Sequence, residues 1–470
     1  MEPIANEKQY VPKKERAAFW VSAFLRDMSY AMSNQVMTFY IDVMGFANER
    51  FSWILKFLPV VERVYDGVND PLVGAYYDRR KHGDTKAKPF FKWTALPIAI
   101  GLFCLFVPIT FSRNEGVNMV LRALFAFLAY ALYEGFQTAN ATAHMSLYNS
   151  ITPNTTERGS IVSIARMFAA GGNGLISGLL PVLYGTIAPD DVGGKRTLYL
   201  GMAGGTAICN LLYNYIMYSK VKERTIAPVE EKVALRPLLV SLLKNKPFII
   251  ILIANAISGL LNAGSTGLYF YQYNIGNTSY QTLVGLMAIP CYLLAGAITP
   301  KLIKAYEKRS VWLVCSALQA ILNIAYILIG YNPVIILFIY SFLSSLPGSI
   351  KQMLYWNMVA DTVDYGEWTT GKRSDGMIYA IEGLSNKIIG AFGQMSTALI
   401  IQYIGFVPNA KTQSQRTLDG LFRVPQYIGL SCVILSAVPY FFYDFSRAKQ
   451  TEAIAAIAAR RESVPSENEI

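Results

Sequence analysis

The sequence is poor in charged residues and in histidine. Only 16% of its 470 residues are charged, whereas an average soluble domain carries about 25%. His82 and His144 are the only two histidines, which is too few for a histidine-based metal centre or catalytic triad. The five cysteines stand singly within apolar runs, so neither a disulfide framework nor a CxxC metal site can be read. These absences argue against a soluble enzyme.

Long apolar stretches take the place of the missing charge. A membrane helix needs roughly 20 mostly apolar residues, and no secretory signal peptide is recognisable before the first stretch. We therefore expect an all-α integral membrane protein with twelve transmembrane helices. The predicted spans are 18–45, 52–77, 90–111, 117–149, 158–187, 197–219, 247–274, 280–303, 310–331, 333–365, 375–405 and 424–446.

The basic residues sort by side of the predicted bundle. About two thirds of the 42 Lys and Arg residues fall in the two ends and in the connections that follow even-numbered spans. The positive-inside rule then predicts that both termini are cytoplasmic. The net charge of +11 is thus a topology signal, and we expect no nucleic-acid partner.

A charged connection divides the twelve spans into two groups of six. This layout is that of the major facilitator transporters, whose binding site lies between the halves, although channels and membrane-embedded enzymes can also have many spans. The tail contains an Ala-rich stretch and a polar end that we expect to be disordered. The predicted parts are an N-terminal segment (1–17), a first six-helix half (18–219), a central loop (220–246), a second half (247–446) and a cytoplasmic tail (447–470).

Several bases remain inside the predicted spans, where an unpaired charge costs several kcal/mol and indicates function. Two of them, Lys56 and Arg122, lie near span ends and can reach the headgroups. Lys351 either pairs with Glu134 or lines a central cavity. The full set is Arg26, Lys56, Arg63, Arg122, Arg166, Lys351 and Lys387.

The second span carries three oxygen-bearing side chains on one helix face. Asp66 and Asp70 are four residues apart, and Asn69 is three from Asp66. This set suits a hard monovalent cation such as Na⁺, or two carboxylates that share a proton. Alternatively, Arg63 only neutralises Asp66 as a structural pair.

A second polar group is predicted from spans one, five and eleven. Arg26 and Asp27 lie about 12 Å into the first span, and Arg166 and Lys387 lie in equivalent spans of the two halves. Their donors, with the Asp27 acceptor, can hold a hydroxylated or anionic substrate. The alternative is an internal ion-pair network of Asp27, Arg166 and Glu382.

Two long motifs resemble the glycoside–pentoside–hexuronide:cation symporters, a family within the major facilitator superfamily. The first runs from Asp66 to Gly74 and is followed by a basic loop that ends Lys86-Ala-Lys88-Pro89-Phe90. The second runs from Ala360 through Asp361, Asp364, Arg373 and Tyr379 to Lys387. The resemblance covers nearly the whole chain.

The resemblance implies roles for particular positions. Asp66, Asn69, Asp70 and Thr138 match cation ligands, and Asp27, Arg166 and Lys387, with Arg26 beside them, match sugar-site positions. The positions matching a cytoplasmic gate of charged residues are Arg158, Lys301, Asp361, Asp364 and Arg373.

Two positions depart from the melibiose-transporting members of the family. Ala141 and Met145 replace an acidic and an aromatic sugar contact. An α-galactoside is therefore not supported, and the more cationic cavity favours an acidic sugar such as a glucuronide or other hexuronide.

We therefore expect a symporter that couples inward movement of a cation to sugar or glycoside uptake, and not an enzyme. Asn69 and Thr138, which a proton does not need, favour Na⁺ over H⁺. No cofactor is expected. The motif GxxxxGK[ST] does not occur in the sequence, so transport driven directly by ATP is not indicated. The expected partners are the sugar, the monovalent cation and the lipid of a bacterial-type cytoplasmic membrane, with a monomer as transport unit. The same fold carrying a lipid or other amphipathic cargo, or a non-transporting membrane sensor, are the alternatives.

Overall fold

The computed structural model describes residues 9–48, 50–79, 85–224, 244–260, 266–371 and 375–462. Over these residues the secondary structure is helical, with no strand. The helices in the first half of the chain are α1 (Lys13–Ser33), α2 (Val36–Asp42), α3 (Ser52–Arg79), α4 (Lys88–Leu105), α5 (Glu115–Ser150), α6 (Thr155–Tyr184) and α7 (Val192–Lys220).

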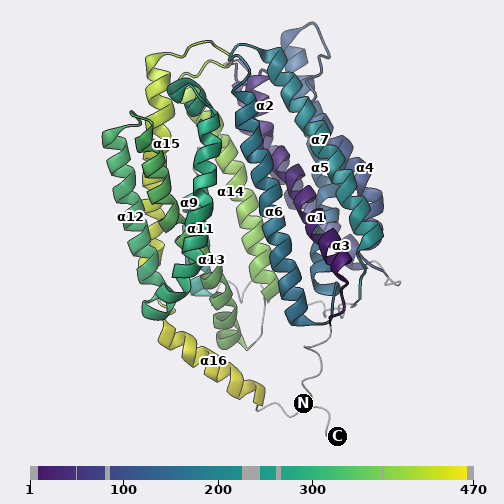
Figure 1. Cartoon of the computed structure of the whole chain (residues 1–470), viewed down its shortest axis with the longest axis vertical. Helices are drawn as coiled ribbons and strands as arrows, with labels where there is room; N and C mark the ends of the chain where they lie inside the picture. The colour runs from purple at the N-terminus through teal and green to yellow at the C-terminus, as the bar shows by residue number, and fades with distance from the viewer. Residues whose placement is uncertain are drawn as a thin grey trace. The chain divides into compact units, whose positions relative to one another are not determined.

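The second half continues the pattern (Figure 1). Its elements are α9 (Lys246–Leu260), α10 (Gly267–Tyr269), the π-helix η2 (Phe270–Ile275), α11 (Ser279–Ala305), α12 (Lys308–Ile329), α13 (Ile335–Thr370), α14 (Asp375–Tyr403), α15 (Gln415–Ala437), the 3₁₀ helix η3 (Pro439–Phe442) and α16 (Arg447–Glu462). Each of the twelve predicted spans coincides with one helix or with two or three consecutive ones.

Local chemistry fixes several helix ends. The Asn114 side chain accepts a hydrogen bond from the Val117 N–H and begins α5, and Asp191 does the same for Gly194 at α7. Gly371, with φ of +73°, ends α13 in the left-handed conformation that glycine adopts without strain.

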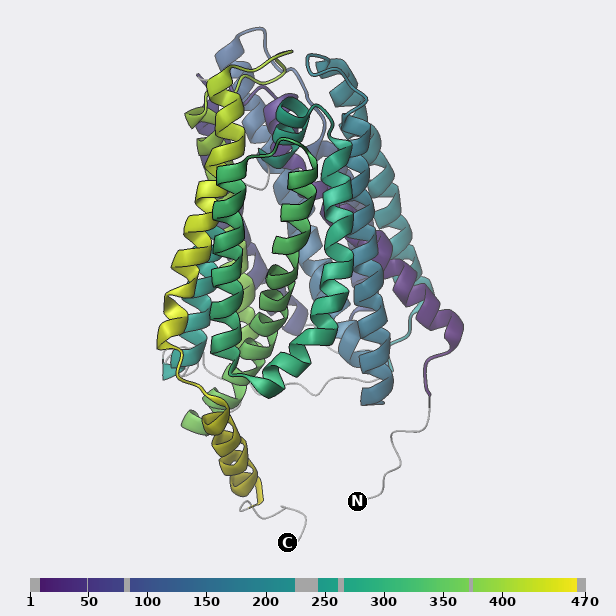
Figure 2. The same cartoon turned by 60° about the vertical axis from the view of Figure 1, so that its left-hand side comes forward.

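The twelfth span was placed too late in the sequence. It was expected from residue 424, but α15 begins at Gln415. Arg416, Asp419 and Arg423 made its first turns look like a loop. The Ala-rich stretch of the tail forms α16, which lies at one end of the helices of its unit in both views (Figures 1 and 2). The polar end, from residue 463, lies outside the described residues.

The chain divides into two compact units. Unit 1 contains Met1–Glu230, Gly276–Thr282 and Ile401–Ser414, and unit 2 contains Glu231–Ile275, Leu283–Ile400 and Gln415–Ile470. In unit 1, α1 packs on α6 and α7, α4 on α5 and α7, and α3 on α5. In unit 2, α12 packs on α13 and α15, α15 on α9, and α13 on α16.

Small residues allow the closest of these contacts in unit 1. A Cβ atom at Gly172 of α6 would overlap the carbonyl oxygen of Phe24 in α1. A Cβ at Gly101 of α4 would lie 2.6 Å from the backbone nitrogen of Tyr133 in α5. Glycine is therefore required at both positions for α1 to meet α6 and for α4 to meet α5.

Six of the described helical segments are long and apolar enough, by themselves, to cross a membrane: 88–105, 115–148, 157–184, 279–305, 308–329 and 415–442. Helix α3 is not among them, although its 28 residues are long enough. It carries Lys56, Glu62, Arg63, Asp66 and Asp70 in its length. Helices α1, α7, α13 and α14 are also missing from this set. The charges that lower the hydropathy of α3 include two of the candidate cation ligands, Asp66 and Asp70.

Candidate functional site

Asp66 is the most enclosed acid of the predicted cation site. Its residue is 1% exposed, on the face of α3 that packs on α5. Oδ2 accepts hydrogen bonds from the Arg63 guanidinium at 2.8 Å and from the Tyr130 hydroxyl at 2.9 Å. Oδ1 is buried and has no hydrogen-bond partner among the residues that the structure describes. The protein thus satisfies the hydrogen-bonding capacity of one oxygen of this carboxylate, and the other oxygen is left to accept a ligand.

The other three predicted ligands lie one turn further along the same helix pair. The Thr138 hydroxyl of α5 donates to Oδ1 of Asp70 at 2.9 Å. The side-chain amide nitrogen of Asn69 is buried without a hydrogen-bond partner. The structure therefore places Asp66, Asn69, Asp70 and Thr138 along one contact between α3 and α5.

Two neighbours were missing from the predicted set. Tyr130 comes from α5, and no spacing in the sequence could connect it with Asp66. Glu62 is 3% exposed and one turn before Asp66, and its Oε1 atom has no hydrogen-bond partner. The sequence could have indicated Glu62, because residues four apart in a helix share one face and Glu62 is four residues before Asp66.

The local charge balance is negative. Glu62 and Asp66 act electrostatically on one another, and Arg63 is the base that acts on both. Buried carboxylate oxygens without partners are costly in a low-dielectric setting. A bound cation, or a proton, would remove that cost.

The predicted substrate residues are distributed over both units. In unit 1, Arg26 pairs with Asp27 at 2.9 Å and its guanidinium lies 5.7 Å from the centre of the Tyr30 ring. Arg166 is exposed on α6, and Lys387 of unit 2 is half-buried on α14. Their approach to a common substrate stays a prediction.

Glu382, a member of the alternative ion-pair network, and Lys351 both have hydrogen-bond partners within unit 2. Glu382 accepts hydrogen bonds from the Tyr355 hydroxyl at 3.0 Å and from Asn386, all within unit 2. Lys351 donates to Oε1 of Gln319 at 3.0 Å and lies 5.1 Å from the Trp312 ring centre. Both side chains therefore have partners inside their own unit.

The predicted gate residues lie near helix ends. Arg158 and Asp364 are half-buried, and Lys301 is exposed. Asp361 is buried and pairs with Lys308, while Gln450 of α16 donates to its other oxygen at 2.7 Å. Arg373 lies outside the described residues. The gate as a whole stays a prediction.

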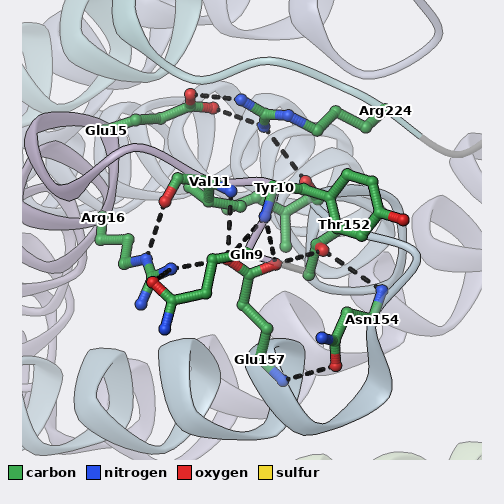
Figure 3. A network of polar contacts seen from close by, with 10 residues as sticks. Gln9, Tyr10, Val11, Glu15, Arg16, Thr152, Asn154, Glu157 and Arg224 are labelled. Carbon is green, nitrogen blue, oxygen red and sulfur yellow. Dashed lines mark hydrogen bonds and ion pairs between the residues drawn. The ribbon is translucent and has the colours of Figure 1, made fainter. Parts of the chain in front are cut away.

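Glu157 anchors the beginning of the described chain in unit 1 (Figure 3). Its carboxylate accepts hydrogen bonds from the backbone N–H groups of Tyr10 and Val11, from the Thr152 hydroxyl at 2.6 Å, and from Arg16 at 2.6 Å. The residue is 6% exposed. One carboxylate thus joins the N-terminal segment, the α5–α6 connection and α6.

A second carboxylate extends this network to the chain that follows α7. Arg224 donates to both oxygens of Glu15, at 2.8 and 2.6 Å, and to the Ile151 carbonyl (Figure 3). The hydrogen bond with Glu15 raises the pKa of Arg224 above its usual value. The arginine therefore keeps its charge at any physiological pH.

The described residues form helices without strands and fall in two compact units, and solved transporters of the major facilitator fold match this structure. The chain belongs to the MFS/sugar transport protein family, whose model matches residues 22–447. Because this is a family of transporters, the chain is a transporter and not an enzyme. The family match confirms the predicted superfamily, and the solved structures confirm the predicted fold class.

Two relatives of the chain are sugar carriers by name. It is 26% identical over 460 residues to the isoprimeverose transporter of Lactiplantibacillus pentosus, covering 94% of this chain and 90% of that one. It is 24% identical over 459 residues to a putative sulfoquinovose importer of Salmonella typhimurium, covering 96% and 93%. The crystal structure of a D-xylose–proton symporter matches with a TM-score of 0.64 at 13% identity, covering 91% and 96%, and supports the fold.

Proposed function

We propose that this transporter is a symporter that couples the inward movement of a cation, Na⁺ in preference to H⁺, to sugar or glycoside uptake. The observation that carries the proposal is the unpartnered Oδ1 atom of Asp66, one helix turn from Asn69 and from the Asp70–Thr138 hydrogen bond. Carboxylate, amide and hydroxyl oxygens are the ligands that a hard cation prefers. Neutral oxygen ligands would be superfluous for a proton.

The cation is proposed to bind first at Asp66, Asn69 and Asp70, to offset the repulsion between the two aspartates, and to order α3. The sugar then binds with higher affinity, through Arg26, Asp27, Arg166 and Lys387. The coupling is reciprocal: if the cation strengthens sugar binding, the sugar strengthens cation binding by the same factor.

Alternating access requires the charged gate to form and release in each cycle. We assign this role to Arg158, Lys301, Asp361, Asp364 and Arg373. The Lys308 and Gln450 contacts of Asp361 would compete with any gate partner. Ion pairs of this kind contribute modestly to stability, about 0.2–1 kcal/mol when exposed, so the motion of the gate can break them.

Both termini are proposed to face the cytoplasm of a bacterial cell.

The proposed substrate is a sugar that carries an acid, such as a glucuronide or another hexuronide. Arg26 and Arg166 supply positive charge in unit 1, and Ala141 stands where a melibiose transporter has an acid. A relative named as an importer of sulfoquinovose, a sulfonated sugar, is consistent with this choice. The isoprimeverose transporter points to neutral glycosides as the comparison class.

Uptake of a labelled panel tests the proposed function. Neutral glycosides and the matching glucuronides would be offered to proteoliposomes with and without a Na⁺ gradient at fixed pH. We expect Na⁺ to increase the uptake of at least one of these sugars severalfold. A panel without any dependence on Na⁺ or pH would refute symport.

Thr138→Val should weaken the response to Na⁺. The change removes the hydroxyl that holds Asp70 while keeping the shape of the side chain, and a hydrogen bond to a charged group is worth about 1.5–3 kcal/mol. We expect the Na⁺ concentration for half-maximal uptake to rise by roughly 10-fold. Thr138→Ser, which keeps the hydroxyl, is the control and should stay near wild type. Equal Na⁺ curves for Val and Ser would remove Thr138 from the site.

A further inference from the structure

Unit 2 contains a partly open cavity, and the residues that line it include none of the predicted site residues. Its volume is about 530 Å³, within the range of about 300–1,000 Å³ that is usual for small-molecule sites. The walls come from α9, α10, η2, α12, α13 and α15. The side chains that matter here are Tyr271, Tyr326, Tyr340, Phe422 and Gln426.

The walls carry no formal charge. Among the described residues that line the cavity there is no Asp, Glu, Lys, Arg or His. An anionic or cationic ligand would lose its hydration and find no counter-charge, which is costly. The cavity therefore selects for a neutral ligand.

Buried polar atoms in and behind the wall lack partners. Tyr326 is 3% exposed, and its hydroxyl has no hydrogen-bond partner. Asn323 is 7% exposed; its amide nitrogen donates to the Tyr340 hydroxyl at 3.3 Å, whereas its oxygen has no partner. The Tyr340 hydroxyl in turn donates to Oε1 of Gln426 at 3.3 Å. Of the two unpartnered residues, Tyr326 lies in the wall: an acyl chain would leave its hydroxyl unsatisfied, whereas a ligand hydroxyl group would pair with it.

Aromatic rings supply the apolar part of the wall. The Tyr326 and Tyr340 rings are stacked with centroids 4.0 Å apart, and Phe422 meets Tyr326 edge-on at 5.2 Å. Rigid aromatic walls with a few polar groups are usual in ligand pockets. A pyranose ring matches such a wall, because it has an apolar C–H face and a rim of hydroxyl groups.

The backbone at the cavity is irregular. Phe270 and Tyr271, which line it, belong to the six-residue π-helix η2. π-Helical turns are rare and are found frequently at functional sites. The uncharged wall, the unpaired polar atoms, the aromatic rings and the π-helix thus all indicate that this cavity is a ligand-binding site.

We propose that this cavity is a binding site for a neutral pyranose ring, held by Tyr326, Tyr340 and Gln426. The site lies entirely within unit 2 and includes none of the residues assigned to the cation or to the acidic sugar. It does not depend on cation coupling, so it can be tested separately.

Binding to the full chain in lipid nanodiscs, free of alkyl-glycoside detergent, tests the site. The probes are p-nitrophenyl β-D-glucopyranoside and the glucuronide of the same phenol, which differ in one carboxylate, measured by calorimetry without Na⁺. We expect Gln426→Leu and Tyr340→Phe to weaken binding of the neutral glycoside by at least 10-fold. Tyr427→Phe, at an exposed neighbour on α15, should leave it unchanged. Unchanged affinity in both cavity variants would overturn the proposal.

Cysteine labelling of the unaltered chain gives a readout that no folding defect can mimic. Cys432 lines the cavity, whereas Cys291 and Cys315 are buried in the same unit outside its wall. We expect the neutral glycoside to slow N-ethylmaleimide labelling of Cys432 at least fivefold, read by peptide mass spectrometry. Cys291 and Cys315 should be unaffected, and the glucuronide should protect less. Equal labelling of Cys432 with and without glycoside would mean that the cavity holds only water or lipid.

Discussion

Asp66→Cys should abolish uphill accumulation of sugar, with Na⁺-driven uptake falling by at least about 100-fold, because an intramembrane acid with an open oxygen is a coupling group. The substitution removes the unpartnered Oδ1 atom and also frees Arg63 and Tyr130, which both donate to Oδ2. Accumulation against a gradient in proteoliposomes measures the effect. Downhill exchange of sugar is expected to be lost less completely, since the fold of the sugar site does not require Asp66.

Asp444→Cys is the matched control for Asp66→Cys. Asp444 is also an acid paired with a base, Lys449 at 2.9 Å, but it is exposed and lies outside the helix pair α3–α5. Its loss should leave accumulation near wild type. Asp66→Cys with accumulation equal to that of the control would remove this residue from the cation site.

Glu157→Ala should destabilise the chain by about 3 kcal/mol or more, the cost of removing one partner from a buried ion pair. The change leaves the backbone N–H groups of Tyr10 and Val11, the Thr152 hydroxyl and the Arg16 guanidinium without their common acceptor. The N-terminal segment should then separate from the α5–α6 connection. Thermal unfolding in nanodiscs, combined with proteolysis near residue 10, measures both effects.

Glu452→Ala is the control for the loss of a glutamate. Glu452 is exposed on α16, and such surface changes usually stay within about 0.5 kcal/mol. Equal unfolding temperatures for the two variants would show that the network in Figure 3 contributes nothing to stability.

The spans could be predicted because membrane helices must be long and apolar. Where the prediction failed, charge near a helix end was the reason: Arg416, Asp419 and Arg423 hid the first turns of α15. The packing of α16 could not be predicted from the sequence, because the residues that hold this helix in place are distant from it in the sequence. Arg460 donates to the carbonyls of Glu367 and Trp368 at the end of α13, and Gln450 to Asp361.

The candidate cation site shows a similar division. Asp66, Asn69 and Asp70 could be placed on one face by helical spacing alone. Tyr130 could not, because its contact with Asp66 depends on how α5 packs against α3. Gly172 of α6 serves close packing against Phe24, whereas Gly383 and Gly390 of α14 face open space.

The structural-pair interpretation of Arg63 accounts for one oxygen of Asp66. Arg63 does neutralise Asp66 as a structural pair, through Oδ2. Oδ1 remains buried and unpartnered, so the pair does not exhaust the carboxylate. A helix that kept its ion pair only for stability would have no need of Glu62, a second acid one turn away whose Oε1 also lacks a partner.

Equilibrium binding of ²²Na⁺ to the purified chain, with and without a transported sugar, tests cation coupling most directly. Sugar should raise the Na⁺ affinity, and Na⁺ should raise the sugar affinity by the same factor, in the range of about 5–150-fold that is typical of coupled sites. Asp66→Cys should bind no Na⁺ at these concentrations. A Na⁺ affinity that is the same with and without sugar, or Na⁺ binding that survives Asp66→Cys unchanged, would contradict the account.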